Sequence, residues 1–515
     1  MLNLGESMDP ASSGSQPATG SPSASTTTTA KPYAVAVSGI LVSNDVRSTA
    51  EASLTNADVT RAGDVTVGAT QTGKIEASVT SKVQSKLKPG TKPGTKEAIA
   101  VGAVIAANVV TGSSTATVTG SKLGAGNGKT VGNVTVEAAN TGTITATISS
   151  IVESSKTAVG VTAAFNKIGT SSQNVLFDLT DAILGTDLGT VIQGANAFAA
   201  TASISGQPIN ATGRVKVSAL SKATIAADIK NAVTTVGAEV TGVGAVVGLN
   251  FARLATSATL SGMNSVTASG VAVSALSQSK IDAVVTAPVT SVAYRTPSTD
   301  PNAPPSGEGP KAGHTISVGM SIARNTIVDT ALVAGIDEVG TVTATAGDVR
   351  VIAGSGATIN ATATATAVAL LFSTEENKNV GVAVGGALGF NTILGGVDAH
   401  ITNTRTALIE ARGNAAPDAK GEGGQGNITV SATNTSSITA KIEAAAAAVI
   451  VGKGASQAVA VGVTLAFNMI GFYGSGLPTG TDFKNGTDRS LNVTAGVSGT
   501  RLSARRKVTV EATSA

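Results

Sequence analysis

The sequence contains no cysteine and no tryptophan, and aromatic residues make up only 2% of its 515 residues. Without cysteine, the fold can have neither disulfide bonds nor a thiolate metal site, which fits an extracellular protein that avoids thiol chemistry. Without large aromatic side chains, a conventional globular core is excluded. The hydrophobic residues that remain are mostly Val, Ala and Ile, which make a thin core between closely spaced backbones. The composition therefore predicts stacked β-layers.

Charge is also scarce, because 13% of the residues are charged and the formal net charge is +3. Nucleic-acid binding needs a broad basic surface with stacking aromatic side chains. The one dense basic cluster is Arg501, Arg505, Arg506 and Lys507, so we predict a solvated loop and no nucleic-acid partner. No stretch of 18 or more residues is cleanly apolar, which predicts that the chain is not transmembrane.

The first 32 residues are mainly Ser, Thr, Pro, Gly and Ala in no periodic order, which predicts that residues 1–32 form a disordered low-complexity segment. The N-terminal residues do not contain a basic stretch followed by an apolar stretch, which is the pattern of a signal peptide. We still expect an extracellular or cell-surface location; either export uses another route or the sequence is an excised segment. Across residues 33–515 hydrophobic and polar residues alternate with a period of two, which predicts one β-repeat array.

The array is built from repeats. One recurring segment follows a pattern like A-V-x-V-G-x-x-x-x-x-N-x-I, as in AIAVGAVIAANVV and QAVAVGVTLAFNMI. Its seven copies carry the asparagines Asn44, Asn108, Asn166, Asn250, Asn325, Asn391 and Asn468. Such repeats indicate units that bury their hydrophobic faces against their neighbours.

A second series of strands, with the pattern V-x-V, alternates with the first in constant order. Its members begin at Val65, Val134, Val215, Val271, Val349, Ile428 and Val508. Each member except the last is followed by a second alternating stretch, so we expect four or five strands in each unit. The run Ala444–Ala448 has helical propensity, but its place in the repeat predicts a strand. Together, the two series predict an all-β, elongated β-solenoid or β-roll-like array of about seven units.

Insertions fall at fixed places between these strands, as expected when variable loops decorate a constant scaffold. Residues 174–194, NVLFDLTDAILGTDLGTVIQG, carry apolar residues near helical spacing, which predicts one short helical insertion packed on the array.

The ends of the array have no distinct polar capping unit, which solenoids normally need for solubility. Open strand edges pair readily with another chain, and a head-to-tail contact that does not close gives a filament. Either the sequence is therefore a slice of a larger protein, or its ends stack head to tail. We predict a homo-oligomer or filament formed through open β ends. Alternatively, residues 1–32 add to a neighbour's open edge as a donor strand.

Residues suited to catalysis are few. The two histidines, His314 in a Pro/Gly-rich loop region and His400 after an asparagine strand, lack the spacing of a metal site, and we expect both to be structural. Glycoside chemistry needs clustered carboxylates, whereas the acidic residues here are sparse and lie mostly in loops. We therefore predict no catalytic residues, no cofactor and no enzymatic activity.

Two further groups of polar residues have alternative interpretations. Residues 480–488 contain Asp482, Asn485 and Asp488, whose oxygen atoms are suitable ligands for calcium. An Asx-rich turn explains these residues better. The seven repeated asparagines either line a ligand-binding groove or form a hydrogen-bonded ladder inside the solenoid. We expect the ladder, because a buried amide must be hydrogen-bonded.

Segments such as VKVSALSKATIAADI and QAVAVGVTLAFNMI resemble large repetitive bacterial surface proteins and adhesins, of the filamentous-haemagglutinin-like group. The resemblance covers residues 33–515 and implies a surface-exposed β-solenoid that acts as an adhesin stalk, matrix component or filament subunit, with host or cell-surface glycans or matrix as partners. The alternative is a β-helix that binds or cleaves polysaccharides, although three tyrosines and no tryptophan offer few platforms for sugar stacking.

Overall fold

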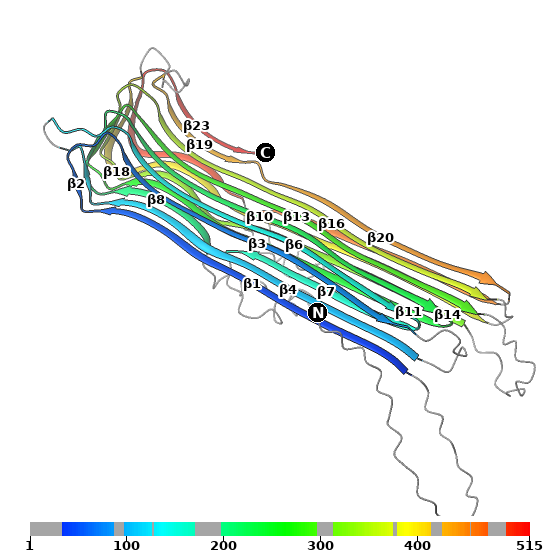
Figure 1. Cartoon of the computed structure of the whole chain (residues 1–515). Coiled ribbons are helices and arrows are strands. Elements are labelled where there is room, and N and C mark those ends of the chain that lie inside the picture. The colour runs from blue at the N-terminus through cyan, green and yellow to red at the C-terminus, as the bar shows by residue number, and fades with distance from the viewer. Residues whose placement is uncertain are drawn as a thin grey trace, which may run out of the picture.

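The computed structural model of the chain describes residues 33–86, 97–125, 128–169, 197–295, 313–373, 378–413, 425–453, 455–471 and 491–515. These residues contain strands and no helix, and every strand pair among them is parallel. Long strands run side by side along the whole molecule (Figure 1). The prediction of an all-β, solenoid-like array is confirmed. The proposed helix at 174–194 and the segment 1–32 lie outside the described residues.

The first sheet contains the asparagine strands. Its members are β1 (Tyr33–Thr55), β4 (Glu97–Thr119), β7 (Thr157–Ile168), β8 (Phe198–Ser205), β11 (Val240–Ser261), β14 (Gly313–Asp337), β17 (Asn379–Gly395), β18 (Val397–Ala411), β21 (Ser456–Ile470) and β22 (Val493–Ala504). Three coils have two shorter strands in place of one long strand. These pairs are β7 with β8 in the third coil, and β17 with β18 and β21 with β22 in the later coils.

The second sheet contains the V-x-V strands and faces the first. Its members are β3 (Val65–Ser85), β6 (Val134–Ser154), β10 (Arg214–Gly237), β13 (Gly270–Arg295), β16 (Val349–Ser373), β19 (Ile428–Asn434), β20 (Ser437–Gly452) and β23 (Val508–Ser514). The two alternating stretches expected as separate strands form one continuous strand in five coils, because no turn residue interrupts the alternation. The run Ala444–Ala448 lies in β20, so the strand prediction there is confirmed.

Short strands form a third face at one end of the molecule, which we call the three-sided end. They are β2 (Asp58–Val59), β5 (Lys122–Leu123), β9 (Ile209–Asn210), β12 (Ser265–Ala268) and β15 (Thr341–Ala344), and the second half of β18 continues their row. At the opposite end, which we call the flat end, second-sheet strands connect to first-sheet strands. Each coil thus runs along the second sheet, returns along the first sheet, and crosses the short face.

The long dimension of the array lies along the strands. β13 has 26 residues, which at about 3.3 Å per residue extend for about 85 Å. Seven coils spaced about 4.8 Å apart stack to only about 30 Å. The array is therefore a slab whose coils are much wider than their stack is tall.

The core lies between the two sheets and changes along the strands. At the three-sided end it is made of side chains such as Leu260, Ile336 and Val342, all fully buried. Near the flat end many inward residues are small, as in Ala383 and Ala369, although Leu371 and Val240 are buried there as well. The thin core expected from composition describes the flat end only, because the third face widens the other end.

Candidate functional site

The seven asparagines form one row across the first sheet. The Nδ2 of each asparagine donates a hydrogen bond of 2.8 Å to the Oδ1 of the asparagine in the next coil. The five inner asparagines have no exposed surface, and they are Asn108, Asn166, Asn250, Asn325 and Asn391. Since these amides face the core and are fully occupied with one another, they offer no surface to a ligand.

The ladder has a direction, because every amide donates toward the C-terminal coil. At one end, the Oδ1 of Asn44 has no donor among the described residues, and at the other the Nδ2 of Asn468 has no acceptor among them. The row therefore ends in one free acceptor and one free donor.

A column of glycines lies six residues before the asparagines and was not recognised as a feature of its own in the sequence. It consists of Gly102, Gly160, Gly244, Gly319, Gly385 and Gly462. A Cβ on Gly244 would lie 2.7 Å from Cγ2 of Val289, and one on Gly319 would lie 2.9 Å from the carbonyl oxygen of Thr366. At every glycine of the column except Gly462, the facing sheet is thus too close for a side chain, which explains the repeated V-G of the motif.

Asp329 is a carboxylate inside the core, at a β-bulge of β14. Its Oδ1 accepts a hydrogen bond of 2.8 Å from the hydroxyl of Ser277, and its Oδ2 accepts one of 2.9 Å from Ser355, both on the second sheet. Burial raises the pKa of the Asp329 carboxyl, while the two serine hydrogen bonds act in the opposite direction. With 6% of its surface exposed, this carboxyl joins the two sheets and cannot reach a large substrate.

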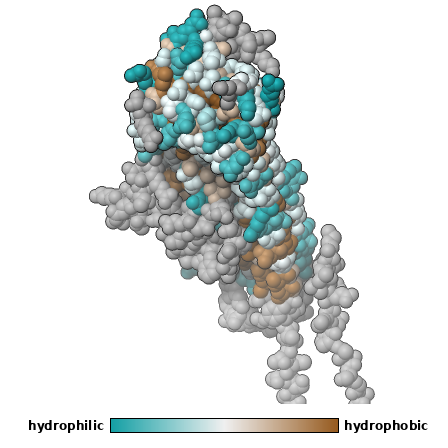
Figure 2. Space-filling view, turned by 90° about the vertical axis from the view of Figure 1, so that its left-hand side faces the viewer, coloured by the Kyte–Doolittle hydropathy of each residue, from teal (hydrophilic) through white to brown (hydrophobic). Residues whose placement is uncertain are grey.

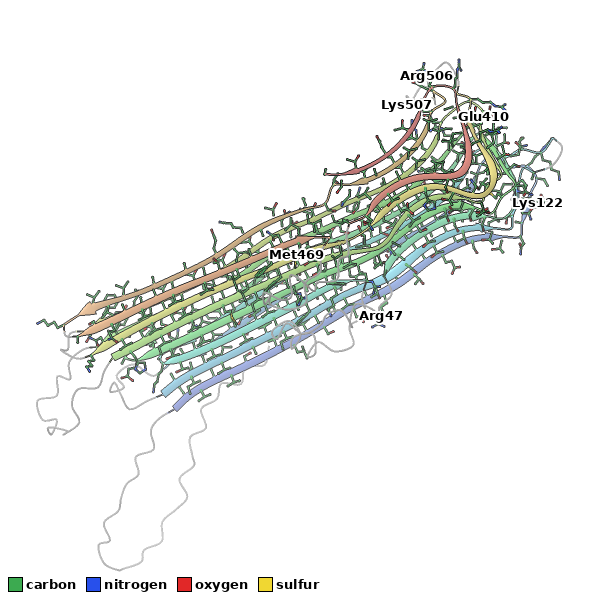
Figure 3. All side chains as sticks on the ribbon, turned by 180° about the vertical axis from the view of Figure 1, so that it is seen from behind. Arg47, Lys122, Glu410, Met469, Arg506 and Lys507 are labelled. Atoms are coloured by element: carbon green, nitrogen blue, oxygen red, sulfur yellow. The ribbon has the colours of Figure 1, made fainter. Side chains whose placement is uncertain are left out.

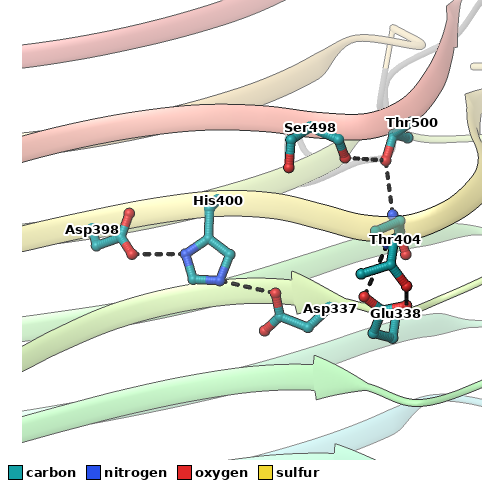
Figure 4. A network of polar contacts seen from close by, with 8 residues as sticks. Asp337, Glu338, Asp398, His400, Thr404, Ser498 and Thr500 are labelled. Carbon is teal, nitrogen blue, oxygen red and sulfur yellow. Dashed lines mark hydrogen bonds and ion pairs between the residues drawn. The ribbon is translucent and has the colours of Figure 1, made fainter.

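His400 lies on the outer face of β18 between two carboxylates (Figure 4). Its Nε2 is 2.9 Å from Oδ1 of Asp337 in the preceding coil, and its Nδ1 is 2.8 Å from Oδ2 of Asp398. The hydrogen bond to Asp337 raises the pKa of His400 to about 9 against the effect of burial, and the charge of Asp398 contributes further. A histidine that stays protonated at neutral pH is a poor general base and instead links two coils electrostatically.

The other histidine, His314, is the second residue of β14 and not part of a loop, because the strand begins directly after the Pro/Gly-rich stretch. Its side chain is exposed on the outer face. The calcium ligands considered in the sequence, Asp482, Asn485 and Asp488, lie outside the described residues. Within the described ranges, no three His, Cys, Asp or Glu side chains are grouped to hold a metal ion.

The outermost coils expose apolar side chains along unpaired strand edges. On β1, Val35, Val37 and Leu41 are 61%, 71% and 72% exposed. On β21, at the other side of the stack, Val461 and Leu465 are 42% and 41% exposed. Seen from the three-sided end, hydrophilic residues gather on that end and apolar residues lie farther along the body (Figure 2).

No protein-family model, curated protein or solved structure matches this chain. The part of the chain that the structure describes contains no apolar helix of membrane-spanning length. The candidate site is the asparagine ladder, which runs through all seven coils, together with the open strand edges at which it ends.

Proposed function

We propose that the protein is a structural repeat protein of the cell surface or extracellular space, which forms a rod or fibre as an adhesin stalk, matrix component or filament subunit. The observation that supports this proposal most strongly is the stack itself. Its coils pair in parallel with the repeats aligned, apart from register shifts at Leu254/Ala255 and Thr402/Ala407, and each asparagine bonds to the asparagine of the next coil. An architecture in which each unit contacts only its neighbours can be continued by further units, which suits self-association.

The connections at the flat end support a role in which the array presents its loops to binding partners. Residues 238–239 join the two sheets in one coil, whereas residues 296–312 do so in the next. A constant coil with connections of varied length is typical of scaffolds whose loops carry the interactions. Host or cell-surface molecules are the proposed partners of these loops.

The proposal is tested by negative-stain electron microscopy and light scattering of the purified chain across a concentration series. Filaments that lengthen with concentration would establish a fibre subunit. Uniform slabs at every concentration would contradict the fibre and leave a spacer whose interactions lie in its loops.

A second candidate function, glycan binding, is favoured by one observation. Tyr294 and Phe372 stack on adjacent strands with ring centroids 5.3 Å apart, and they are 53% and 38% exposed. Exposed aromatic rings are suited to contacts with sugar faces. A glycan array probed with the wild type and with Tyr294→Ala/Phe372→Ala tests this function. Binding that survives the double substitution, or no binding by the wild type, would exclude this pair as a glycan site.

A further inference from the structure

We propose that the last coil, made of β21, β22 and β23, accepts the first coil, made of β1, β2 and β3, of a second copy in the same register that joins coils within one chain. This inference rests on the proposed fibre function and specifies its interface. It follows from three independent properties of the two coils: ladder polarity, charge and apolar exposure.

The register is fixed by unbroken rows of paired residues. The V-x-V row leads from Val65 through each second-sheet strand to Val508. The asparagine row leads in the same way from Asn44 to Asn468. If another coil is added in this register, Val508 meets Val65 and Asn468 meets Asn44 of the second copy.

In this arrangement the two free ends of the ladder complete each other. The Nδ2 of Asn468 is the free donor, and the Oδ1 of Asn44 is the free acceptor. Because the ladder has one direction, a contact between two first coils or two last coils would bring like groups together. Only the head-to-tail arrangement continues the ladder.

In the same register, basic residues of the last coil lie opposite acidic residues of the first coil of the second copy. Lys507 directly precedes Val508, and Asp64 directly precedes Val65, so Lys507 lies over Asp64. The row of short strands leads from Val59 through Leu123, Ile209, Val266, Val342 and Ile409 to Leu502. Arg501 therefore lies over Asp58. The basic cluster of the sequence thus faces acidic residues of the first coil, and Lys507 and Arg47 mark the two opposite edges (Figure 3).

The exposed apolar residues fall into matching rows as well. Val37 shares its row with Val461, and Leu41 shares its row with Leu465. All four are at least 41% exposed in the single chain.

Two charge-reversal variants test the interface. The first, Arg501→Glu/Lys507→Glu, makes the last coil acidic, and the second, Asp58→Lys/Asp64→Lys, makes the first coil basic. Because like charges then oppose each other, each variant alone should raise the concentration needed for assembly by at least about tenfold. An equimolar mixture should restore assembly, since the acidic last coil of the first variant fits the basic first coil of the second variant, and the two unaltered coils also fit each other. The matched control for the first variant is Lys222→Glu/Lys230→Glu on β10, which makes the same change in net charge in a middle coil.

The outcomes separate the two proposals. If the wild type never assembles, the fibre function itself is wrong. If the wild type assembles while the reversals have no effect, or the mixture does not recover, the fibre stands and this interface is wrong. Recovery in the mixture also shows that both variants are folded.

Discussion

The two ends of the slab have the same alternation of inward and outward residues but different cores. At the three-sided end, the short face holds the sheets apart, and Val, Ile and Leu fill the space. At the flat end, glycines stand opposite valines, and where Ala367 and Ala446 replace those valines, the backbones themselves meet. Residue size is therefore set by the separation of the layers, whereas strand formation is set by the alternation alone.

The wide core should be sensitive to loss of volume. Leu260→Ala leaves a cavity among fully buried residues and should lower the free energy of unfolding by about 3 kcal/mol. The control Leu276→Ala removes a side chain that is 39% exposed and should cost much less. Denaturant unfolding followed by circular dichroism measures both, and equal losses would contradict a packed three-sided core.

The flat end should be sensitive to gain of volume. Gly385→Val places a Cβ 2.6 Å from the carbonyl oxygen of Ala445, so we expect a loss of about 2–3 kcal/mol. Gly386 is its neighbour on the outer face, where a Cβ meets nothing within 4 Å. Gly386→Val should therefore be close to neutral. Similar unfolding midpoints for the two variants would show that the sheets are not in close contact here.

The ladder connects coils near the boundary of the two regions. Asn250→Ala leaves the Nδ2 of Asn166 and the Oδ1 of Asn325 buried without partners and should cost about 2 kcal/mol. Asn468→Ala removes a single bond at an exposed position and should cost less. Amide hydrogen exchange in β7, β11 and β14 reports the difference, and equal protection in both variants would argue against the ladder as a stabilising element.

Asp329 should make stability depend on pH. Since burial raises its pKa in the folded chain, ionisation destabilises the fold as pH rises from about 3.8 through the raised value. Asp329→Asn keeps a hydrogen-bonding group without the charge, so at neutral pH it should be more stable than the wild type by about 1 kcal/mol. The difference should vanish below pH 3.8 or so. An unfolding series over pH that shows a constant difference would contradict this assignment.

His400 should act in a different pH range and more weakly. Its pKa of about 9 in the folded chain lies above the ordinary value of about 6.5. The stabilisation by Asp337 is therefore complete below pH 6.5 or so and is lost as pH rises through 9. His400→Gln should cost less than about 1 kcal/mol at pH 6, because the group is partly exposed. NMR titration of His400, with His314→Gln as control, would contradict the assignment if the pKa were near 6.5.

Much of the fold could be predicted from the sequence, because each coil repeats the same alternation and the same asparagine. The positions of Asn44 to Asn468 align the first-sheet strands, and the V-x-V series aligns the second. The bulge at Asp329 could not be predicted, since it depends on one extra residue relative to the neighbouring coil. The pairing of His400 with Asp337 also depends on register, because these residues meet only when two coils are stacked. The role of the glycines required the distance between the sheets, which alternation does not encode.

The orientation of the strands across the stack gives the molecule unequal mechanical strength. A pull along the strands loads the hydrogen bonds of a whole coil together in shear, so many bonds must break at once. A pull along the stack acts on the hydrogen bonds end-on and can peel one coil from the next. A fibre of these slabs would thus be strong when it is pulled along the strands and weak when it is pulled along the stack, where one coil separates from the next.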